Sequence, residues 1–359
     1  MKVNEITFLL VVIAFLVSCT VNNNTVDELF IKGQMVNINE NEGKDITWVF
    51  GNRAYARDRK ANVYSGELSV EKLMRYDRLF ESGHGHNEFG MVALSQGYDG
   101  SLYILDRPFA GMKLLSLTKI KHVDEISCVK NQTEWERYDL DKLPSFFTCG
   151  DTFEVLSDST ILVTGTPADD LKHVLSIVDF KNQTVTPLNY WPDDDIPDKS
   201  INDKLIVYTE YTGIEGNGKG RFLYWNNSGL LAFIFTIDGK KMNILKNIYN
   251  EHLPIPDVDK TPSTERVFCC SNSDRIYLLY LNCNEKGEKI EKFDIKDPFP
   301  MGNIVEVYNW NGEKLNVIHL DRFGRNIYIS GEGKTLYLYT SYMNDENQYM
   351  YSYDLSSLK

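Results

Sequence analysis

The stretch LLAFIFTIDGKKMNIL, residues 230–245, decides the fold. A strand-like run of apolar and aromatic residues leads to Asp238-Gly239, and a second such run follows the turn. Asx-Gly pairs tolerate the positive φ of tight hairpins, so this pattern predicts two antiparallel strands. The same layout recurs in HVLSIVDFKNQTVTPL at 173–188 and in NIVEVYNWNGEKLNVIHL at 303–320, where Asn311-Gly312 forms the turn. The chain therefore repeats one kind of hairpin.

A second repeated element alternates with these hairpins. It is a turn followed by a strand of aliphatic and aromatic residues, and it occurs at 95–106, 156–165, 271–280 and 330–340. Two hairpins in succession make a four-stranded sheet, which is the unit of a β-propeller. About 340 mature residues, divided by roughly 40–50 residues per blade, give six or seven units. We predict an all-β chain folded as a six-bladed β-propeller, with seven blades as the poorer fit.

The predicted blades cover approximately 40–85, 86–140, 145–192, 198–252, 262–320 and 322–357. The fourth is ambiguous, because KLIVYTEY at 204–211 and RFLYWNN at 221–227 compete for its inner strand. One segment, 65–80, has apolar spacing typical of a helix. We expect the segment 28–38 to close the ring beside 349–355, because pairing of the two ends protects open sheet edges. Two stacked sandwich domains are the alternative, and they do not explain the paired hairpins.

The N-terminal residues have the layout of an export signal. The apolar run from Ile6 to Val17 has the length of a signal-peptide core and is short for a bilayer span. It ends in Leu16-Val17-Ser18-Cys19, which resembles the bacterial lipobox, in which the cysteine is acylated. We predict a signal peptide over 1–18, lipidation of Cys19, a tether over 19–27, one propeller domain over 28–359, and anchoring to the outer membrane of the cell envelope. An ordinary secretory leader or a short membrane anchor is the alternative.

Charge and cysteine content exclude two classes of protein. With 38 basic and 51 acidic side chains, the net charge of −13 does not suit nucleic acid or anionic lipid. Five cysteines follow Cys19, and this odd number argues against a disulfide scaffold. They are Cys128, Cys149, Cys269, Cys270 and Cys283. If 266–283 is a hairpin that turns near Ser273, Cys283 falls opposite Thr264 and out of bridging reach, so we expect buried strand cysteines.

The stretch FESGHGHNEFGMVALSQGYDGSLYILDRPFAGMKLLSL, 80–117, resembles the connection between blades in NHL-type and TolB-like six-bladed propellers. The matching residues are Gly83, Gly85, Glu88, Phe89, Asp99, Gly100, Tyr103 and Asp106. The glycines let the chain reverse, and the phenylalanine can fill the seam between two sheets. His86 departs from the pattern, since proline usually stands there.

Together with the lipobox, the mature chain resembles the TolB-like propeller lipoproteins of Gram-negative bacteria. This resemblance implies a fold, an export route and binding of other envelope proteins through the mouth of the ring, but no reaction.

Two stretches could bind a metal, but each also fits a purely structural role. His84 and His86, with Glu88, could ligate a divalent metal if they shared one face of a strand, whereas a glycine-rich turn does not align them. We therefore favour a turn. The run WPDDDIPD at 191–198 offers Asp193, Asp194 and Asp195 to calcium, but it lacks the spaced ligands of an EF-hand, and its prolines favour a connection between blades.

Two glycine-rich stretches complete the list of candidate sites. The stretch GEGKT at 331–335 predicts a hairpin turn, because Tyr328 stands where a phosphate-binding loop needs its first glycine. The stretch GIEGNGKGR at 213–221 predicts a loop at one mouth of the ring, long enough to bind a ligand. Its candidate binding residues are Gly216, Asn217, Lys219 and Arg221.

These features favour a non-catalytic, lipid-anchored module that binds an envelope protein, peptide or glycan. We expect a monomer with no nucleic-acid partner, and we predict no cofactor. The competing hypothesis is a metal-dependent hydrolase or lyase with acids and histidines in the central channel, since propeller enzymes gather single residues from several blades. A stoichiometric divalent metal in the purified protein would favour this second hypothesis.

Overall fold

The computed structural model describes residues 26–38, 43–73, 76–83, 88–107, 114–121, 132–147, 152–192, 201–209, 212–251, 253–254, 263–292, 300–340 and 348–358. Several residues singled out above lie outside these ranges: Cys19 and the leader, His84, Gly85, His86, Cys128, Cys149, Asp193, Asp194 and Asp195. Within the described ranges, no helix has the length and hydropathy needed to cross a bilayer.

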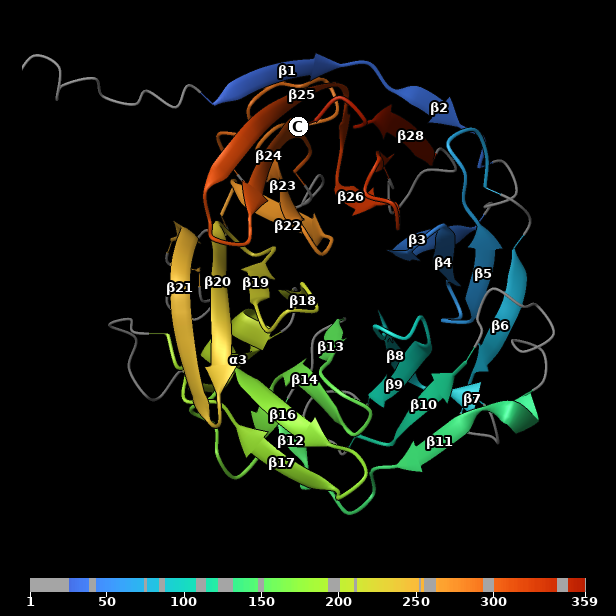
Figure 1. Cartoon of the computed structure of the whole chain (residues 1–359), viewed down its shortest axis with the longest axis vertical. Coiled ribbons are helices and arrows are strands. Elements are labelled where there is room, and N and C mark those ends of the chain that lie inside the picture. The colour runs from blue at the N-terminus through green and yellow to red at the C-terminus, as the bar shows by residue number, and fades with distance from the viewer. Residues whose placement is uncertain are drawn as a thin grey trace, which may run out of the picture.

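Six sheets stand around a central axis and form a six-bladed β-propeller (Figure 1). Blade one contains β3 (Lys44–Phe50), β4 (Arg53–Asp58), β5 (Val63–Glu67) and β6 (Asp77–Ser82), to which the short β7 (Glu88–Phe89) adds in parallel. Blade two contains β8 (Met91–Gln96), β9 (Leu102–Arg107), β10 (Ser116–Ile120) and β11 (Glu136–Asp139). A 3₁₀ turn, η2 (Gln132–Glu134), precedes β11. Blade three contains β13 (Phe153–Val155), β14 (Thr160–Thr164), β16 (Leu175–Asp179) and β17 (Thr184–Pro187).

The remaining blades follow the same antiparallel order. Blade four contains β18 (Thr212–Gly216), β19 (Phe222–Asn226), β20 (Leu231–Asp238) and β21 (Lys241–Asn250). Blade five contains β22 (Arg266–Ser271), β23 (Arg275–Leu281), β24 (Gly302–Asn309) and β25 (Lys314–Gly324). Blade six contains β26 (Asn326–Ile329), β27 (Thr335–Thr340) and β28 (Tyr349–Asp354). A separate pair, β12 (Phe146–Phe147) and β15 (Thr166–Pro167), flanks blade three.

The two ends of the chain close the ring, as predicted. The strand β2 (Gln34–Val36) pairs antiparallel with β28 and supplies the outermost strand of blade six. The strand β1 (Asp27–Ile31) differs from the prediction, because it runs parallel to β25 on the edge of blade five (Figure 1). Between them, Gly33 passes so close to Tyr353 that an added Cβ would lie 2.6 Å from its ring. The N-terminal segment therefore covers two sheet edges.

The predicted positions of the blades are confirmed, and two local predictions are wrong. The described residues of 65–80 do not form a helix, because β5 pairs with β4 and β6 pairs with β5 along this segment. Its apolar side chains belong to β5, to β6 and to the connection between them, and they fill the core of blade one. Their helix-like spacing therefore does not come from a helix. In the described chain the α-helix is instead α3 (Ile201–Thr209), which precedes blade four. Neither candidate for the inner strand of that blade was right: β18 over 212–216 is the innermost strand, and β19 over 222–226 is the second.

The core lies between neighbouring blades. Phe89 is 1% exposed and packs against Phe80 of blade one with 4.6 Å between ring centroids. The same cluster includes Val92 and Ile104 of blade two. Phe89 therefore fills the seam between two sheets, as the sequence predicts, and its burial stabilises the joint between them.

Candidate functional site

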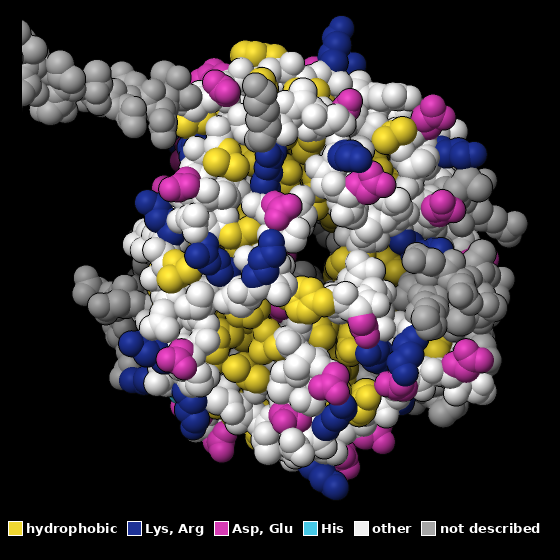
Figure 2. Space-filling view, in the orientation of Figure 1, with side chains coloured by type: hydrophobic (Ala, Val, Ile, Leu, Met, Phe, Trp, Pro, Cys, Tyr) yellow, Lys and Arg dark blue, Asp and Glu magenta, His cyan; other side chains and the backbone are white. Residues whose placement is uncertain are grey.

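A cavity of about 520 Å³ occupies the channel near one mouth of the ring. Its wall comes mainly from the innermost strand of every blade, and these strands contact one another around the axis. They are β3, β8, β13, β18, β22 and β26. The turns that leave these strands form much of the rim, including Gly51, Tyr98 and Asp274. Figure 2 shows an opening at the centre of one face of the molecule. The volume is in the range of small-molecule sites.

Two side chains and one backbone amide, from three successive blades, meet at this cavity. The Tyr98 hydroxyl, from the turn after β8, donates to Oε1 of Glu154 on β13. Glu154 also accepts from the backbone N–H of Gly216 at the end of β18. A Cβ on Gly216 would lie 2.5 Å from Glu154 Oε1 and 2.8 Å from the Tyr98 hydroxyl. Glycine at 216 therefore allows blades two, three and four to meet at one carboxyl group.

The environment of Glu154 favours its neutral form. Its side chain is buried, at 8% exposure of the residue. Burial and the nearby Glu215 raise its pKa to about 8, against the opposing effect of the hydrogen bonds from Tyr98 and Gly216. Burial and the charge of Glu154 raise the pKa of Tyr98 as well. At neutral pH the side chain of Glu154 is therefore mostly a neutral carboxylic acid, which can both accept and donate hydrogen bonds.

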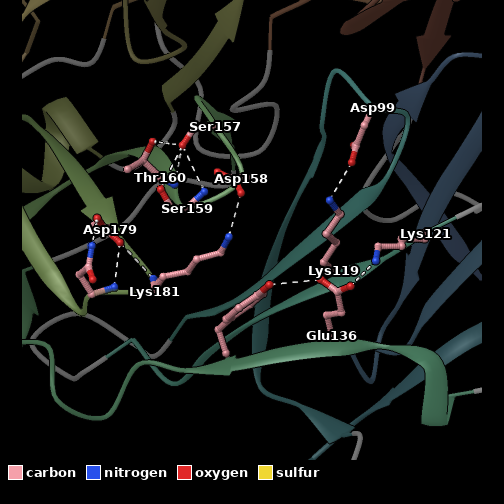
Figure 3. Close-up of polar contacts among 12 residues, drawn as sticks. Asp99, Lys119, Lys121, Glu136, Ser157, Asp158, Ser159, Thr160, Asp179 and Lys181 are labelled. Atoms are coloured by element: carbon pink, nitrogen blue, oxygen red, sulfur yellow. Dashed lines mark hydrogen bonds and ion pairs between the residues drawn. The ribbon is translucent and has the colours of Figure 1, made fainter.

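The turn that carries Tyr98 is fixed by an ion pair within blade two (Figure 3). Lys119 Nζ on β10 lies 2.7 Å from Asp99 Oδ2, and Asp99 Oδ1 accepts from the backbone N–H of Ser101 at 3.0 Å. Burial alone would raise the pKa of Asp99, but these hydrogen bonds lower it. Gly100 takes the positive φ of 78° that the turn needs. Tyr98 is thus held over the rim although 58% of it is exposed.

A second acid follows one blade further around the ring. Glu215 on β18 is held by hydrogen bonds with the side chain and backbone of Ser271 on β22. Burial raises the pKa of Glu215 to about 7, while the bonds to Ser271 oppose that rise. Both acids line the same cavity, and each lies at a seam between two blades. The pair can accept hydrogen bonds from a donor in the cavity and can exchange protons near neutral pH.

An indole lies beside Glu215. Trp225 belongs to β19, the second strand of blade four, yet it lines the cavity. It reaches across Gly213, where an added Cβ would lie 2.1 Å from indole Nε1. Residues 213 and 215 share one face of the strand, so the indole lies next to the acid. Trp225 is 5% exposed, and its N–H has no acceptor among the described residues.

The opposite wall of the cavity is apolar and aromatic. It includes Phe50 of blade one, and Tyr328 and Ile329 of blade six. Phe268 of blade five also lines the cavity, but on the side of the acids, with its ring centroid 4.8 Å from that of Trp225. Among the described residues that line the cavity, none is Lys, Arg or His. Acids on one side and aromatic rings on the other therefore face each other across a partly enclosed space.

The prediction of a loop over 213–221 is wrong in its first half, because residues 213–216 pair as part of β18 and only 217–221 turn at the rim. The four candidate residues also differ in position. Gly216 lines the cavity, and Lys219 Nζ lies 3.5 Å from Asp274 Oδ1 across the mouth. Asn217 is buried and caps the turn, since its Oδ1 accepts from the backbone N–H of Lys219 at 2.8 Å and of Arg221 at 3.1 Å. Arg221 points away, donating to the carbonyl of Trp310 at 2.7 Å and to Asn311.

The other candidate residues lie apart from the cavity or outside the described ranges. Glu88 is at the seam between blades one and two, where its carboxyl packs on Gly83. Cys269, Cys270 and Cys283 are free and buried, as expected. Gly333 in the predicted hairpin turn has a φ of 69°. No group of three or more His, Cys, Asp and Glu side chains suited to a metal occurs in the described part of the chain.

Sequence reasoning did not identify Tyr98, Glu154, Glu215 or Trp225. The available signal was the strand Thr-Gly-Ile-Glu-Gly at 212–216, because glycines inside a strand often mark a close approach by another group. The partners that fill this space come from other blades, and a single sequence does not show which turns meet at the mouth.

The fold and the cavity define the chain as a six-bladed β-propeller with an acid-lined site in its channel. No protein-family model and no curated protein sequence matches it. Solved structures are similar in fold. A protein of Bacteroides fragilis named as exported is 8% identical, with 91% of this chain and 98% of that chain covered at a TM-score of 0.50.

Two further solved structures are similar to the chain. The β-propeller domain of Cps50 (Swd1) from Myceliophthora thermophila is 10% identical, with 90% and 98% covered and a TM-score of 0.47. An oligogalacturonate lyase in complex with manganese is 11% identical, with 88% and 78% covered and a TM-score of 0.42. At these identities the likeness concerns the fold.

Proposed function

We propose that this protein is a binding module of the cell envelope that holds a ligand in the channel cavity without transforming it. The observation that carries this proposal is the cavity itself, to which all six innermost strands contribute. Preformed concave sites with an apolar wall and few polar groups are typical of ligand binding. We further propose that Cys19 carries a lipid, that the leader residues direct export, and that envelope peptides, proteins or glycans are the partners.

Ligand binding can be tested by filling the cavity. Thr47 of β3 lines it and is partly buried, whereas Thr184 of β17 is exposed on the outside of blade three. We expect one or more members of a panel of amino acids, dipeptides and saccharides to raise the melting temperature of the wild type and of Thr184→Trp. Thr47→Trp should lose this response, since a ligand at 100 times its Kd stabilises by about 2.7 kcal/mol. Equal responses of the two variants would contradict the proposal.

The anchor and the competing enzymatic hypothesis need separate measurements. Cys19→Ala should move the protein from the membrane fraction to the soluble fraction of the envelope if the cysteine is acylated. Retention of the variant in the membrane would contradict lipidation. Elemental analysis of the purified protein addresses catalysis by metal, because one equivalent of a divalent ion per chain would favour the hydrolase or lyase over the binding module.

A further inference from the structure

The geometry points to the chemistry of the ligand: an alkylammonium group that binds between Glu215 and Glu154, joined to an oxygen atom that accepts from the indole N–H of Trp225. This inference rests on the proposed binding function and specifies it. It follows from the positions of the two acids, the indole and the apolar wall around one cavity.

The two acids provide acceptors for the ammonium. Glu154 and Glu215 lie on neighbouring innermost strands and line the same space, and the charge of one affects the other. Among the described lining residues no basic side chain neutralises them, since Lys219 at the rim pairs with Asp274. Ammonium groups have three donors and no acceptor, so oxygen atoms from two acids match them. Two carboxyl groups supply fewer ligands than calcium requires, which disfavours calcium at this position.

The indole supplies an independent indication. Trp225 is 5% exposed and lines the cavity from the second strand, and its N–H lacks an acceptor among the described residues. A buried donor without a partner is costly and needs an explanation. Because Gly213 leaves the indole edge next to Glu215, one ligand can satisfy the donor with an oxygen while its ammonium reaches the acid. Phe268 beside the indole, and Phe50 and Tyr328 opposite, offer aromatic faces that suit the alkyl chain and the cation.

Cation binding must displace protons from these acids. Burial raises the pKa of Glu154 to about 8 and that of Glu215 to about 7. A bound cation favours the ionised acids, so it lowers both pKa values and releases protons at neutral pH. Affinity should therefore rise as pH increases through 7 and 8. The other titratable groups that face the pair are Tyr98, Cys269 and Cys270, and Asp274 and Glu332 lie at the rim.

Three probes with the same chain length separate the contributions: 5-aminopentan-1-ol, pentylamine, which lacks the oxygen, and pentane-1,5-diol, which lacks the ammonium. Calorimetric titration of the full chain should rank their affinities in that order, with at least a tenfold gap between the aminoalcohol and the diol. The affinity for the aminoalcohol should rise about tenfold or more between pH 6 and 8.5. Titration in two buffers of different ionisation enthalpy should report proton release.

Variants assign these effects to residues. Glu215→Gln should weaken aminoalcohol binding at least tenfold, and Trp225→Phe should reduce its affinity to that of pentylamine. Glu136→Gln is the matched control, since this acid pairs with Lys121 on the outside of blade two and should leave binding unchanged (Figure 3).

The outcomes distinguish the two proposals. Equal affinity for the aminoalcohol and the diol, abolished by Thr47→Trp, would overturn the ammonium assignment and leave the binding function in place. Aminoalcohol binding that survives both Thr47→Trp and Glu215→Gln would place the amine outside the cavity and overturn the assignment. The natural ligand could carry its ammonium on a lysine side chain of a peptide or on a small aminoalcohol. Nα-acetyl-lysine amide separates these two sources, because it should bind about as tightly as the aminoalcohol if the natural ligand is a peptide.

Discussion

Replacing Glu154 with glutamine should make the protein more stable in alkaline solution. Glutamine has nearly the shape of the neutral acid and keeps a carbonyl oxygen for the hydrogen bond from Tyr98. At about pH 4 and below, where the acid is mostly protonated in both folded and unfolded chains, the two proteins should differ by less than about 1 kcal/mol. The wild type then loses stability as pH rises, because the folded state resists ionisation of Glu154.

The magnitude follows from the pKa. Burial raises the pKa of Glu154 from 4.5 to about 8, and each pH unit between these values corresponds to about 1.4 kcal/mol. The stability of the wild type relative to the variant is therefore present below pH 4.5 and is lost progressively up to pH 8. At pH 9 we expect Glu154→Gln to be more stable by about 3–5 kcal/mol. Glu215 is present in both proteins, so its own titration largely cancels.

The assay is denaturant unfolding at a series of pH values from 4 to 9. Glu306→Gln is a control of opposite sign, because Glu306 accepts from Tyr249 and Tyr308 at 2.7 Å each and pairs with Lys314. Burial alone would raise the pKa of Glu306, but these partners lower it. That variant should lose stability at neutral pH and converge with the wild type in acid. Parallel pH profiles for the wild type and Glu154→Gln would refute the reasoning.

Three further changes test the fold. Phe89→Ala should lower the free energy of unfolding by about 3–5 kcal/mol, and Phe30→Ala, at an exposed site on β1, by less than about 0.5 kcal/mol, both measured by denaturation. Gly213→Ala should lower the free energy of unfolding by about 1–3 kcal/mol and alter the near-ultraviolet circular dichroism of Trp225. Gly90→Ala is the control and should do neither, because the added Cβ would lie 3.4 Å from its nearest neighbour, Asp106 Oδ1. Deleting residues 26–38 should lower the melting temperature and promote aggregation, detected by light scattering, because it exposes β25 and β28; unchanged behaviour would contradict closure by the N-terminal strands.

The blades were predictable because hairpin chemistry is local. Asp238-Gly239 and Asn311-Gly312 mark turns through backbone conformation, and the structure gives both glycines positive φ. Alternating side chains then specify which face of each strand is packed. The helix suggested by the apolar spacing of 65–80 was wrong, because such spacing alone does not exclude strands whose pairing partners lie elsewhere in the chain. Conversely, α3 precedes blade four where the apolar run over 204–211 also fits a strand.

The site was not predictable in the same way, because its members meet only through the ring. Tyr98, Glu154 and Gly216 are each unremarkable within their own hairpins. They come together because blades two, three and four present equivalent turns to one mouth of the channel. The unmatched donor of Trp225 likewise depends on Gly213 in the neighbouring strand. Such contacts depend on long-range packing, which local propensity does not encode.

The strand β18 has a different physical role from most other strands of the ring. Those strands, the innermost ones β13 and β26 included, bury large side chains at the seams between blades, and exchange of those residues would weaken the seams. The strand β18 instead carries Gly213, Glu215 and Gly216, residues that contribute little burial and that strands normally disfavour. Because packing elsewhere sustains the ring, the channel wall can accommodate two destabilised acids and an unsatisfied indole. This division allows the blades to provide stability while the channel provides binding chemistry, and it explains why the least strand-like sequence in blade four lies at the candidate site.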